Sequence, residues 1–94
     1  MYELFYAPKS ASMGVRVMLE EIGVPYTLIE TSVDTDKPRP ARQLAINPNG
    51  WLPVLVWDGG AMYECAAITL FLCERHPLAH LAPTVDDPLR ANFL

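Results

Sequence analysis

The hydrophobic pattern of the first third of the chain predicts a strand, a helix and a second strand. Residues 2–6 are a short run of β-forming residues. Apolar residues then recur at three- and four-residue steps, among them Met13 and Val17, which predicts a helix over residues 12–22. Residues 26–30 form a second β run. Because a strand–helix–strand connection within one sheet is parallel and right-handed, we expect the first two strands to pair in parallel.

The second half of the chain predicts a short helix, a hairpin and a longer helix. Residues 41–46 are a weak helical stretch, and residues 53–57 are an apolar strand. Asp58-Gly59-Gly60 is a tight hairpin signal, with the glycine pair as the turn, and it leads to a fourth strand at residues 61–63. Residues 64–75 form a clear helix that ends before a proline. The hairpin implies an antiparallel pair of strands.

Together these elements predict an α/β protein with the order βαβ-α-ββα. The two kinds of connection combine into a small mixed four-stranded sheet with helices flanking its faces. Asp86-Asp87-Pro88 indicates the start of one more helix, with Pro88 in its first turn. At 94 residues, the chain is long enough for one domain of this kind and too short for two.

Composition and charge remove several classes of function. The net charge is −4 and the chain has no basic patch, which excludes nucleic acid as a partner. The longest strongly apolar stretch, residues 66–73, is far too short to span a membrane, and no signal peptide is visible. Cys65 and Cys73 lie too far apart on one predicted helix to bridge each other. Two reduced thiols favour a cytoplasmic protein.

The stretch NPNGWLPVL, residues 47–55, places a proline where a buried strand begins. Proline has no backbone N–H and is normally kept out of central strands. The residues before Trp51 are typical of a turn, and apolar residues stand on both sides of Pro53. Taken alone, Pro53 indicates an ordinary trans proline at the start of an edge strand.

With its neighbours, however, this stretch resembles a known family. NPNGWLPVLVWDGGAMYECAAITLFLCERHP is similar to the second half of the glutathione-binding domain of bacterial-type cytosolic glutathione S-transferases, and YELFYAPKSASMGVRVMLEEIGVPYTLIE is similar to its first half. The resemblance implies a thioredoxin-like fold with a cis-proline. It also implies that residues 1–83 are the glutathione-binding domain and that residues 84–94 are a linker and the start of a truncated helical C-terminal domain.

The resemblance further implies how glutathione would be held. A cis bond before Pro53 turns the backbone of Leu52 outward, so that its N–H and C=O pair with the tripeptide like an added strand. Glu64 pairs with the γ-glutamyl ammonium group, and the N–H of Cys65, at a helix N-terminus, binds the γ-glutamyl carboxylate. Cys65 replaces the usual serine of the family. Trp51 either offers its indole N–H to the glycine end or is covered by a second subunit or domain.

Three hydroxyl groups near the first turn are candidates to stabilise the glutathione thiolate, because a hydroxyl that donates to sulfur favours the charged form. By resemblance, Ser12 matches the serine of the theta-like and some bacterial classes and is the first choice. Tyr6 matches the tyrosine of the alpha, mu and pi classes, and Ser10 is the third candidate. Without the resemblance, Ser12 is equally well explained as a helix N-cap and Tyr6 as an aromatic packed on the core. No ligand spacing indicates a metal site.

The resemblance implies a glutathione transferase that activates the thiol of its co-substrate, glutathione, for attack on a small electrophile. In this family the electrophile pocket lies largely on the helical second domain, so we expect this chain alone to be inactive or weakly active. A homodimer is expected as well. Two alternatives stay open: a non-catalytic transferase-like binding or assembly module, and a glutathione-dependent isomerase or dehalogenase.

Overall fold

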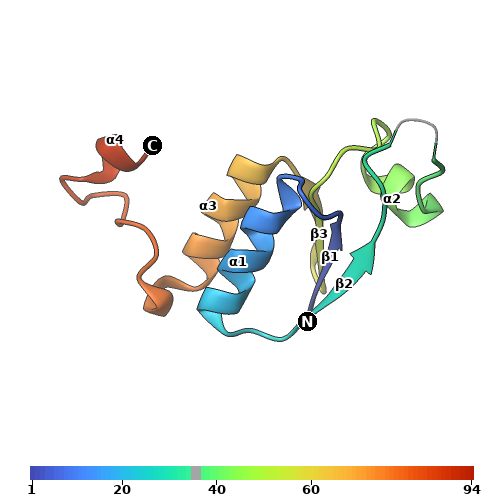
Figure 1. Cartoon of the computed structure of the whole chain (residues 1–94). Coiled ribbons are helices and arrows are strands. Elements are labelled where there is room, and N and C mark those ends of the chain that lie inside the picture. The colour runs from blue at the N-terminus through green and yellow to red at the C-terminus, as the bar shows by residue number, and fades with distance from the viewer. Residues whose placement is uncertain (35–36) are drawn as a thin grey trace.

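The computed structural model describes residues 1–34 and 37–94, and its centre is one four-stranded sheet (Figure 1). The strands follow in the order β2-β1-β3-β4 across this sheet. β1 pairs in parallel with β2, whereas the β1–β3 and β3–β4 pairs are antiparallel. The predicted α/β class and mixed sheet are therefore confirmed. The strand bounds are β1 (Tyr2–Tyr6), β2 (Tyr26–Glu30), β3 (Val54–Trp57) and β4 (Gly60–Tyr63).

Helices lie on both sides of the sheet (Figure 1). The two long helices, α1 (Ser12–Ile22) and α3 (Cys65–Arg75), lie together on one side, and the short α2 (Ala41–Ile46) lies on the other. After α3 the chain makes a 3₁₀ turn, η1 (Pro77–Ala79), and then runs away from the sheet to the short α4 (Arg90–Phe93). Among the described residues, no helix combines the length and the apolar character needed to cross a membrane.

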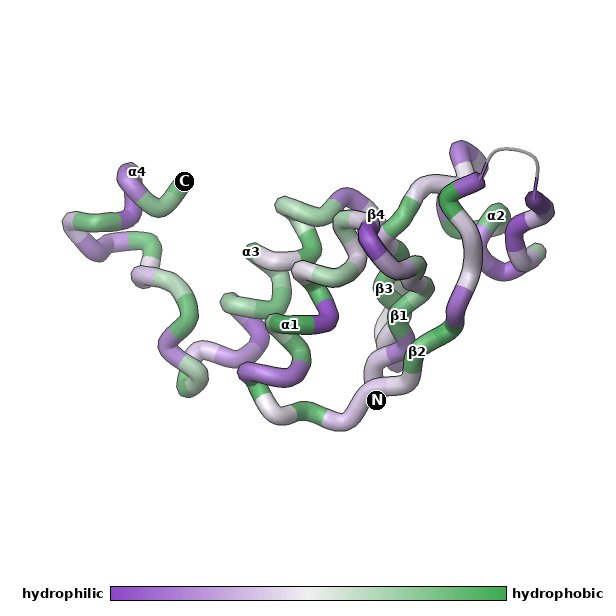
Figure 2. Tube along the Cα trace, in the orientation of Figure 1, coloured by the Kyte–Doolittle hydropathy of each residue, from purple (hydrophilic) through white to green (hydrophobic). Residues whose placement is uncertain are grey.

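The main core lies between the sheet and the pair α1 and α3. Strand side chains alternate between the two faces, so Leu4 and Leu55 from the central strands point toward these helices. The core side chains of the helices, all without solvent exposure, are Val15, Leu19, Ile68 and Leu72. β3 reads as a nearly continuous apolar run (Figure 2), whereas the polar Glu3 interrupts β1.

The apolar pattern of α1 predicts a helix, but it does not identify the face that packs on the sheet. The buried residues of this helix are Ser12, Val15 and Leu19, which follow a three- and four-residue spacing. Met13 and Val17 point away from the core and are 36% and 58% exposed. The helix carries apolar residues on more than one face, and a single face packs on the sheet, so periodicity alone does not distinguish the buried residues from the exposed ones.

Element boundaries in the second half differ by one residue from the predictions, for local reasons. Gly60 pairs with Trp57, so the two-residue turn is Asp58-Gly59 and β4 starts at Gly60. Pro53 lies just before β3, because it has no N–H to give to the ladder. Helix α3 starts at Cys65, since Glu64 before it has φ 80° and cannot be helical.

The last helix starts later than predicted. The Asp87 carboxylate accepts a hydrogen bond of 2.8 Å from the Leu89 N–H, which closes a turn around Pro88. The helix therefore begins at Arg90 and has four residues.

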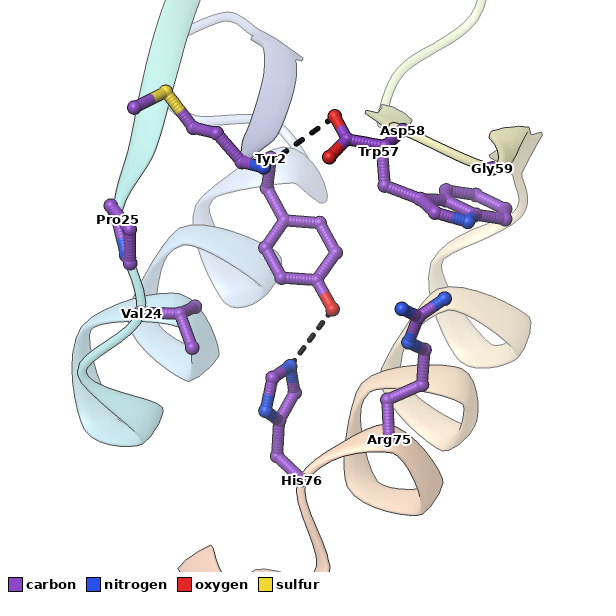
Figure 3. A pocket seen from close by; sticks show the side chains of 9 residues that line it. Tyr2, Val24, Pro25, Trp57, Asp58, Gly59, Arg75 and His76 are labelled. Atoms are coloured by element: carbon purple, nitrogen blue, oxygen red, sulfur yellow. Dashed lines mark hydrogen bonds and ion pairs between the residues drawn. The ribbon is translucent and has the colours of Figure 1, made fainter.

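A polar contact ties the end of α3 to the start of β1 (Figure 3). The Tyr2 hydroxyl and His76 Nε2 are 2.8 Å apart, beside a hollow of about 320 Å³ under the β3–β4 turn. The Asp58 carboxylate at its rim lies 3.6 Å from the N-terminal ammonium group. The Arg75 guanidinium lies over the ring of Phe71, 5.3 Å from its centroid. These polar groups contact one another or an aromatic ring, so we assign this end of the sheet a structural role.

A pair of substitutions on one helix tests the assignment of the core face. Leu19→Ala removes a fully buried side chain and is expected to lower the free energy of unfolding by about 2–5 kcal/mol. Val17→Ala on the exposed side of α1 is expected to change it by less than about 0.5 kcal/mol. Urea unfolding measures both values, and equal effects would contradict the assigned face.

Candidate functional site

Three segments from distant parts of the sequence meet at one edge of the sheet, because of the strand directions. β1 ends at Tyr6, and β3 begins at Val54 opposite Phe5. β4 ends at Tyr63, which is also opposite Val54. The turn after β1, the segment before β3 and the N-terminus of α3 therefore lie at the same edge. All the site residues predicted from the sequence belong to these three segments.

The segment before β3 presents unpaired backbone. The peptide bond between Leu52 and Pro53 is cis, and Pro53 is buried while Leu52 is half-buried. Within residues 1–34 and 37–94, neither the N–H nor the C=O of Leu52 makes a hydrogen bond. An open N–H and C=O on one residue can pair with an extended peptide in the manner of an added strand.

The N-terminus of α3 combines free backbone donors with a free carboxylate. The first backbone bond of the helix runs from the Ile68 N–H to the Glu64 C=O (2.9 Å), so the N–H groups of residues 65–67 have no partner inside the helix. Glu64 is exposed and has φ 80°, a conformation that costs a non-glycine residue about 1–3 kcal/mol. Its carboxylate forms no ion pair in the part of the chain that is described. Groups that attract an anion and a group that attracts a cation are thus adjacent, an arrangement that suits a zwitterionic ligand.

The Cys65 thiol connects this helix end to the turn after β1. Its Sγ lies 3.7 Å from the carbonyl oxygen of Ala11, to which it donates. Neither Cys65 nor Cys73 forms a disulfide. The contact brings α3 and the first turn together at the site, which the separation of these segments along the sequence does not reveal.

The turn after β1 is held by two serine hydroxyl groups. Ser12 Oγ is buried, accepts the Ala7 N–H at 3.1 Å and lies 3.2 Å from the Ala7 carbonyl oxygen. Ser10 Oγ donates to the same carbonyl at 2.7 Å and also contacts Ser12 Oγ. Each hydroxyl carries one proton, so both protons can be used inside the turn. The N-cap of α1 is Ala11, with no side-chain cap, so Ser12 is the first helical residue and not a cap.

Tyr6, the third hydroxyl candidate, stands at the end of β1. Its ring is half-buried against the core, and the Arg16 guanidinium lies 5.7 Å from the ring centroid. Its backbone C=O accepts the Thr31 N–H at 2.9 Å. The phenolic hydroxyl makes no hydrogen bond to a described residue.

The loop before Leu52 is supported by two residues that the sequence analysis missed. Gln43 Nε2 and Arg39 Nε donate to the Gly50 carbonyl at 2.9 and 3.3 Å. Gln43 is buried, and its spacing to Asn47, the other buried polar residue of this region, is one helical turn. That spacing is the signal that could have revealed it. Trp51, by contrast, is 67% exposed.

Glu3 and Cys73, which lie outside this edge, have shifted pKa values with structural causes. The Arg42 guanidinium forms two hydrogen bonds to the Glu3 carboxylate, at 3.0 and 3.3 Å, and this contact lowers the pKa of Glu3. Burial raises the pKa of the Cys73 thiol, which makes it a poor nucleophile at neutral pH. In the described ranges, no three His, Cys, Asp or Glu side chains gather as metal ligands would.

The strand order and the three converging segments define a thioredoxin-like domain. The sequence model of the glutathione S-transferase N-terminal domain matches residues 10–75. The chain therefore belongs to the glutathione S-transferase N-terminal domain family, as its sequence predicts.

Known relatives are similar over most of this chain. It is 34% identical over 89 residues to the glutathione S-transferase GstA of Escherichia coli O157:H7, which covers 90% of this chain and 43% of GstA. A glutathione transferase structure from Methylococcus capsulatus superposes with a TM-score of 0.85 and 28% identity, covering 98% of this chain and 46% of that one. A glutathione transferase homologue from Sulfitobacter with bound glutathione superposes with a TM-score of 0.81 and 31% identity, covering 97% of this chain and 44% of that one. This chain thus spans less than half the length of these relatives.

Replacing the serine hydroxyls tests their part in holding the first turn. Ser12→Ala removes the one side-chain partner that the Ala7 N–H has among residues 1–34 and 37–94. This loss is expected to lower the free energy of unfolding by about 1–3 kcal/mol. Ser10→Ala leaves that N–H paired, so a smaller loss of about 0.5–1.5 kcal/mol is expected. Denaturant unfolding gives both values, and an equal or larger loss for Ser10→Ala would contradict the assigned network.

Proposed function

We propose that this domain binds glutathione at the sheet edge formed by the three segments. The observation that carries the proposal is the unpaired N–H and C=O of Leu52 beside the N-terminus of α3. A tripeptide with a zwitterionic γ-glutamyl end matches both parts of this edge. The bound glutathione of the Sulfitobacter homologue supports the same ligand.

Each part of glutathione has a partner in this arrangement. The cysteinyl backbone pairs with the N–H and C=O of Leu52, next to Pro53. The γ-glutamyl carboxylate accepts from the N–H of Cys65 at the positive end of α3, and the ammonium group pairs with Glu64. The indole of Trp51, which is exposed, lies against the glycine end. The backbone N–H remains available although Cys65 replaces the usual serine.

Activation of the thiol requires a hydroxyl that donates to the sulfur anion. Ser12, Tyr6 and Ser10 are the candidates. The burial of Ser12 favours Ser10 as the hydroxyl in contact with sulfur. When glutathione binds, the single proton of Ser10 turns from the Ala7 carbonyl to the sulfur, and Ser12 stays bound to the Ala7 backbone. Tyr6 is the second choice, and the free phenolic hydroxyl supports it. The thiol proton leaves to solvent, and the stabilised thiolate attacks the electrophile.

Catalysis belongs to a longer assembly. We infer that residues 1–83 are the glutathione-binding unit and that residues 84–94 begin a helical domain that supplies the electrophile pocket. Hydrophobic residues recur along the extended C-terminal segment (Figure 2). Leu78, Val85 and Leu89 among them are exposed, which supports this inference. A homodimer in the cytoplasm completes the proposal.

Calorimetric titration of the chain with reduced glutathione tests the ligand and its site. The wild type is expected to bind, and Glu64→Ala is expected to weaken binding by about ten-fold or more, since a hydrogen bond to a charged group contributes about 1.5–3 kcal/mol. Glu21→Ala, an exposed acid on α1, is the matched control and is expected to bind as the wild type does.

Absence of binding to the folded wild type would exclude the proposed function. Equal binding by wild type and Glu64→Ala would show that the γ-glutamyl end lies elsewhere.

Titration of the bound thiol tests activation. Thiolate absorbance against pH is expected to show that Ser10→Ala raises the pKa of bound glutathione by about one unit or more, because a charge-assisted hydrogen bond is lost. Tyr6→Phe and Ser12→Ala serve as the comparisons. A shift only in Tyr6→Phe would assign the role to Tyr6, and a shift only in Ser12→Ala would assign it to Ser12. No shift in any of the three variants would favour the non-catalytic binding module.

A further inference from the structure

The Gly50 carbonyl connects the loop before Leu52, residues 47–51, to the rest of the domain by two side-chain hydrogen bonds. It accepts Gln43 Nε2 from α2 at 2.9 Å and Arg39 Nε from the preceding loop at 3.3 Å. The Arg39 guanidinium also donates to the carbonyls of Asp34 and Lys37, so one side chain joins two loops. Gly50 itself has φ 74°, which fits a glycine at this sharp turn.

Holding the Gly50 carbonyl with a buried Gln43 side chain reduces the stability of the fold. Gln43 has no solvent exposure, and its Oε1 has no partner among the described residues. A buried acceptor without a partner is rare and destabilising, whereas an apolar side chain of the same size has no such cost. Fold stability alone therefore does not account for an amide at this position.

The position of the bond gives it a second role. Gly50 stands two residues before Leu52, and its own N–H is bound to the Asn47 carbonyl at 2.9 Å. The Asn47 side chain donates to the Trp51 carbonyl at 3.4 Å. Fixing the Gly50 carbonyl thus fixes the plane of the peptide between Gly50 and Trp51. The backbone N–H and C=O of Leu52 follow directly after this peptide. Pre-organised backbone binds a peptide more tightly than mobile backbone, because less conformational entropy is lost.

We propose that Gln43 is a positioning residue for glutathione recognition. It does not touch the ligand. It acts through the Gly50 carbonyl and holds the Leu52 N–H and C=O at the spacing that the cysteinyl backbone of glutathione needs. This inference rests on the proposed glutathione site. The claim that Gln43 holds the backbone of residues 50–52 can be tested without the ligand.

Gln43→Met is the test, because methionine has a similar length and volume and carries neither the amide donor nor the unpaired Oε1. Calorimetry with reduced glutathione is expected to show a loss of affinity of about three- to ten-fold, the size of one net hydrogen bond. Thermal unfolding is expected to show an unchanged or higher midpoint, since the unpaired acceptor is gone. Affinity and stability therefore change independently.

Tyr2→Phe is the matched control. It removes the hydrogen bond to His76 at the opposite end of the sheet. Its expected result is the reverse pattern, a lower unfolding midpoint with wild-type affinity for glutathione. The pair of variants separates a positioning role from a general loss of stability.

Two results would overturn the proposal: wild-type affinity in Gln43→Met, or a loss of affinity accompanied by a lower unfolding midpoint. If the wild type itself fails to bind glutathione, the proposed function is wrong, and the loop is tested directly by NMR. Gln43→Met must then shift the amide signals of residues 50–52 and speed hydrogen exchange at the Gly50 N–H, while signals of β1 and β2 stay in place. Unchanged signals at residues 50–52 would overturn the positioning role as well.

Discussion

The antiparallel pairing of β1 with β3 is the constraint on which the rest of the structure depends. It places Leu4 opposite Leu55 and Phe5 opposite Val54, and all four side chains are buried. The same pairing aligns the end of β1 with the start of β3, so it assembles the site edge while it builds the core. A slip of one residue would turn Leu55 to the other face of the sheet and move the Leu52 edge away from the first turn.

The strands and helices of this fold are predictable from the sequence because their patterns are strong and local. Strands β1 and β2 match the predicted ranges, and so do α1 and α2. The face that α1 buries is not predictable in this way, because Met13 and Val17 are as apolar as the residues that the sheet covers. Which face packs depends on the position of β1 and α3, and no local pattern contains that information.

Some residues of the candidate site are predictable from local sequence motifs, and the others depend on tertiary structure. Leu52, Pro53, Glu64 and Cys65 stand in short linear motifs, and the fold brings their segments to one edge. The difference between Ser10 and Ser12 is tertiary: both are turn serines in the sequence, and only the fold buries Ser12 against the Ala7 backbone. The spacing of Gln43 to Asn47 marks a polar pair one helical turn apart, but the sequence does not show that Gln43 binds the Gly50 carbonyl, because the fold brings that carbonyl to it.

The proposed glutathione site consists mainly of backbone groups, and these do not depend on the identity of the side chains beside them. An N–H of Leu52 or Cys65 is present whatever the side chain is, so the change from serine to Cys65 leaves the donor at the helix end in place. What such a site requires is exact placement of the chain, which side chains must provide from a distance. The buried, incompletely paired Gln43 and the left-handed backbone of Glu64 both reduce stability at this edge. The apolar side chains buried between the sheet, α1 and α3 offset these costs. This core lies apart from the proposed site residues, so the two parts of the domain meet different requirements.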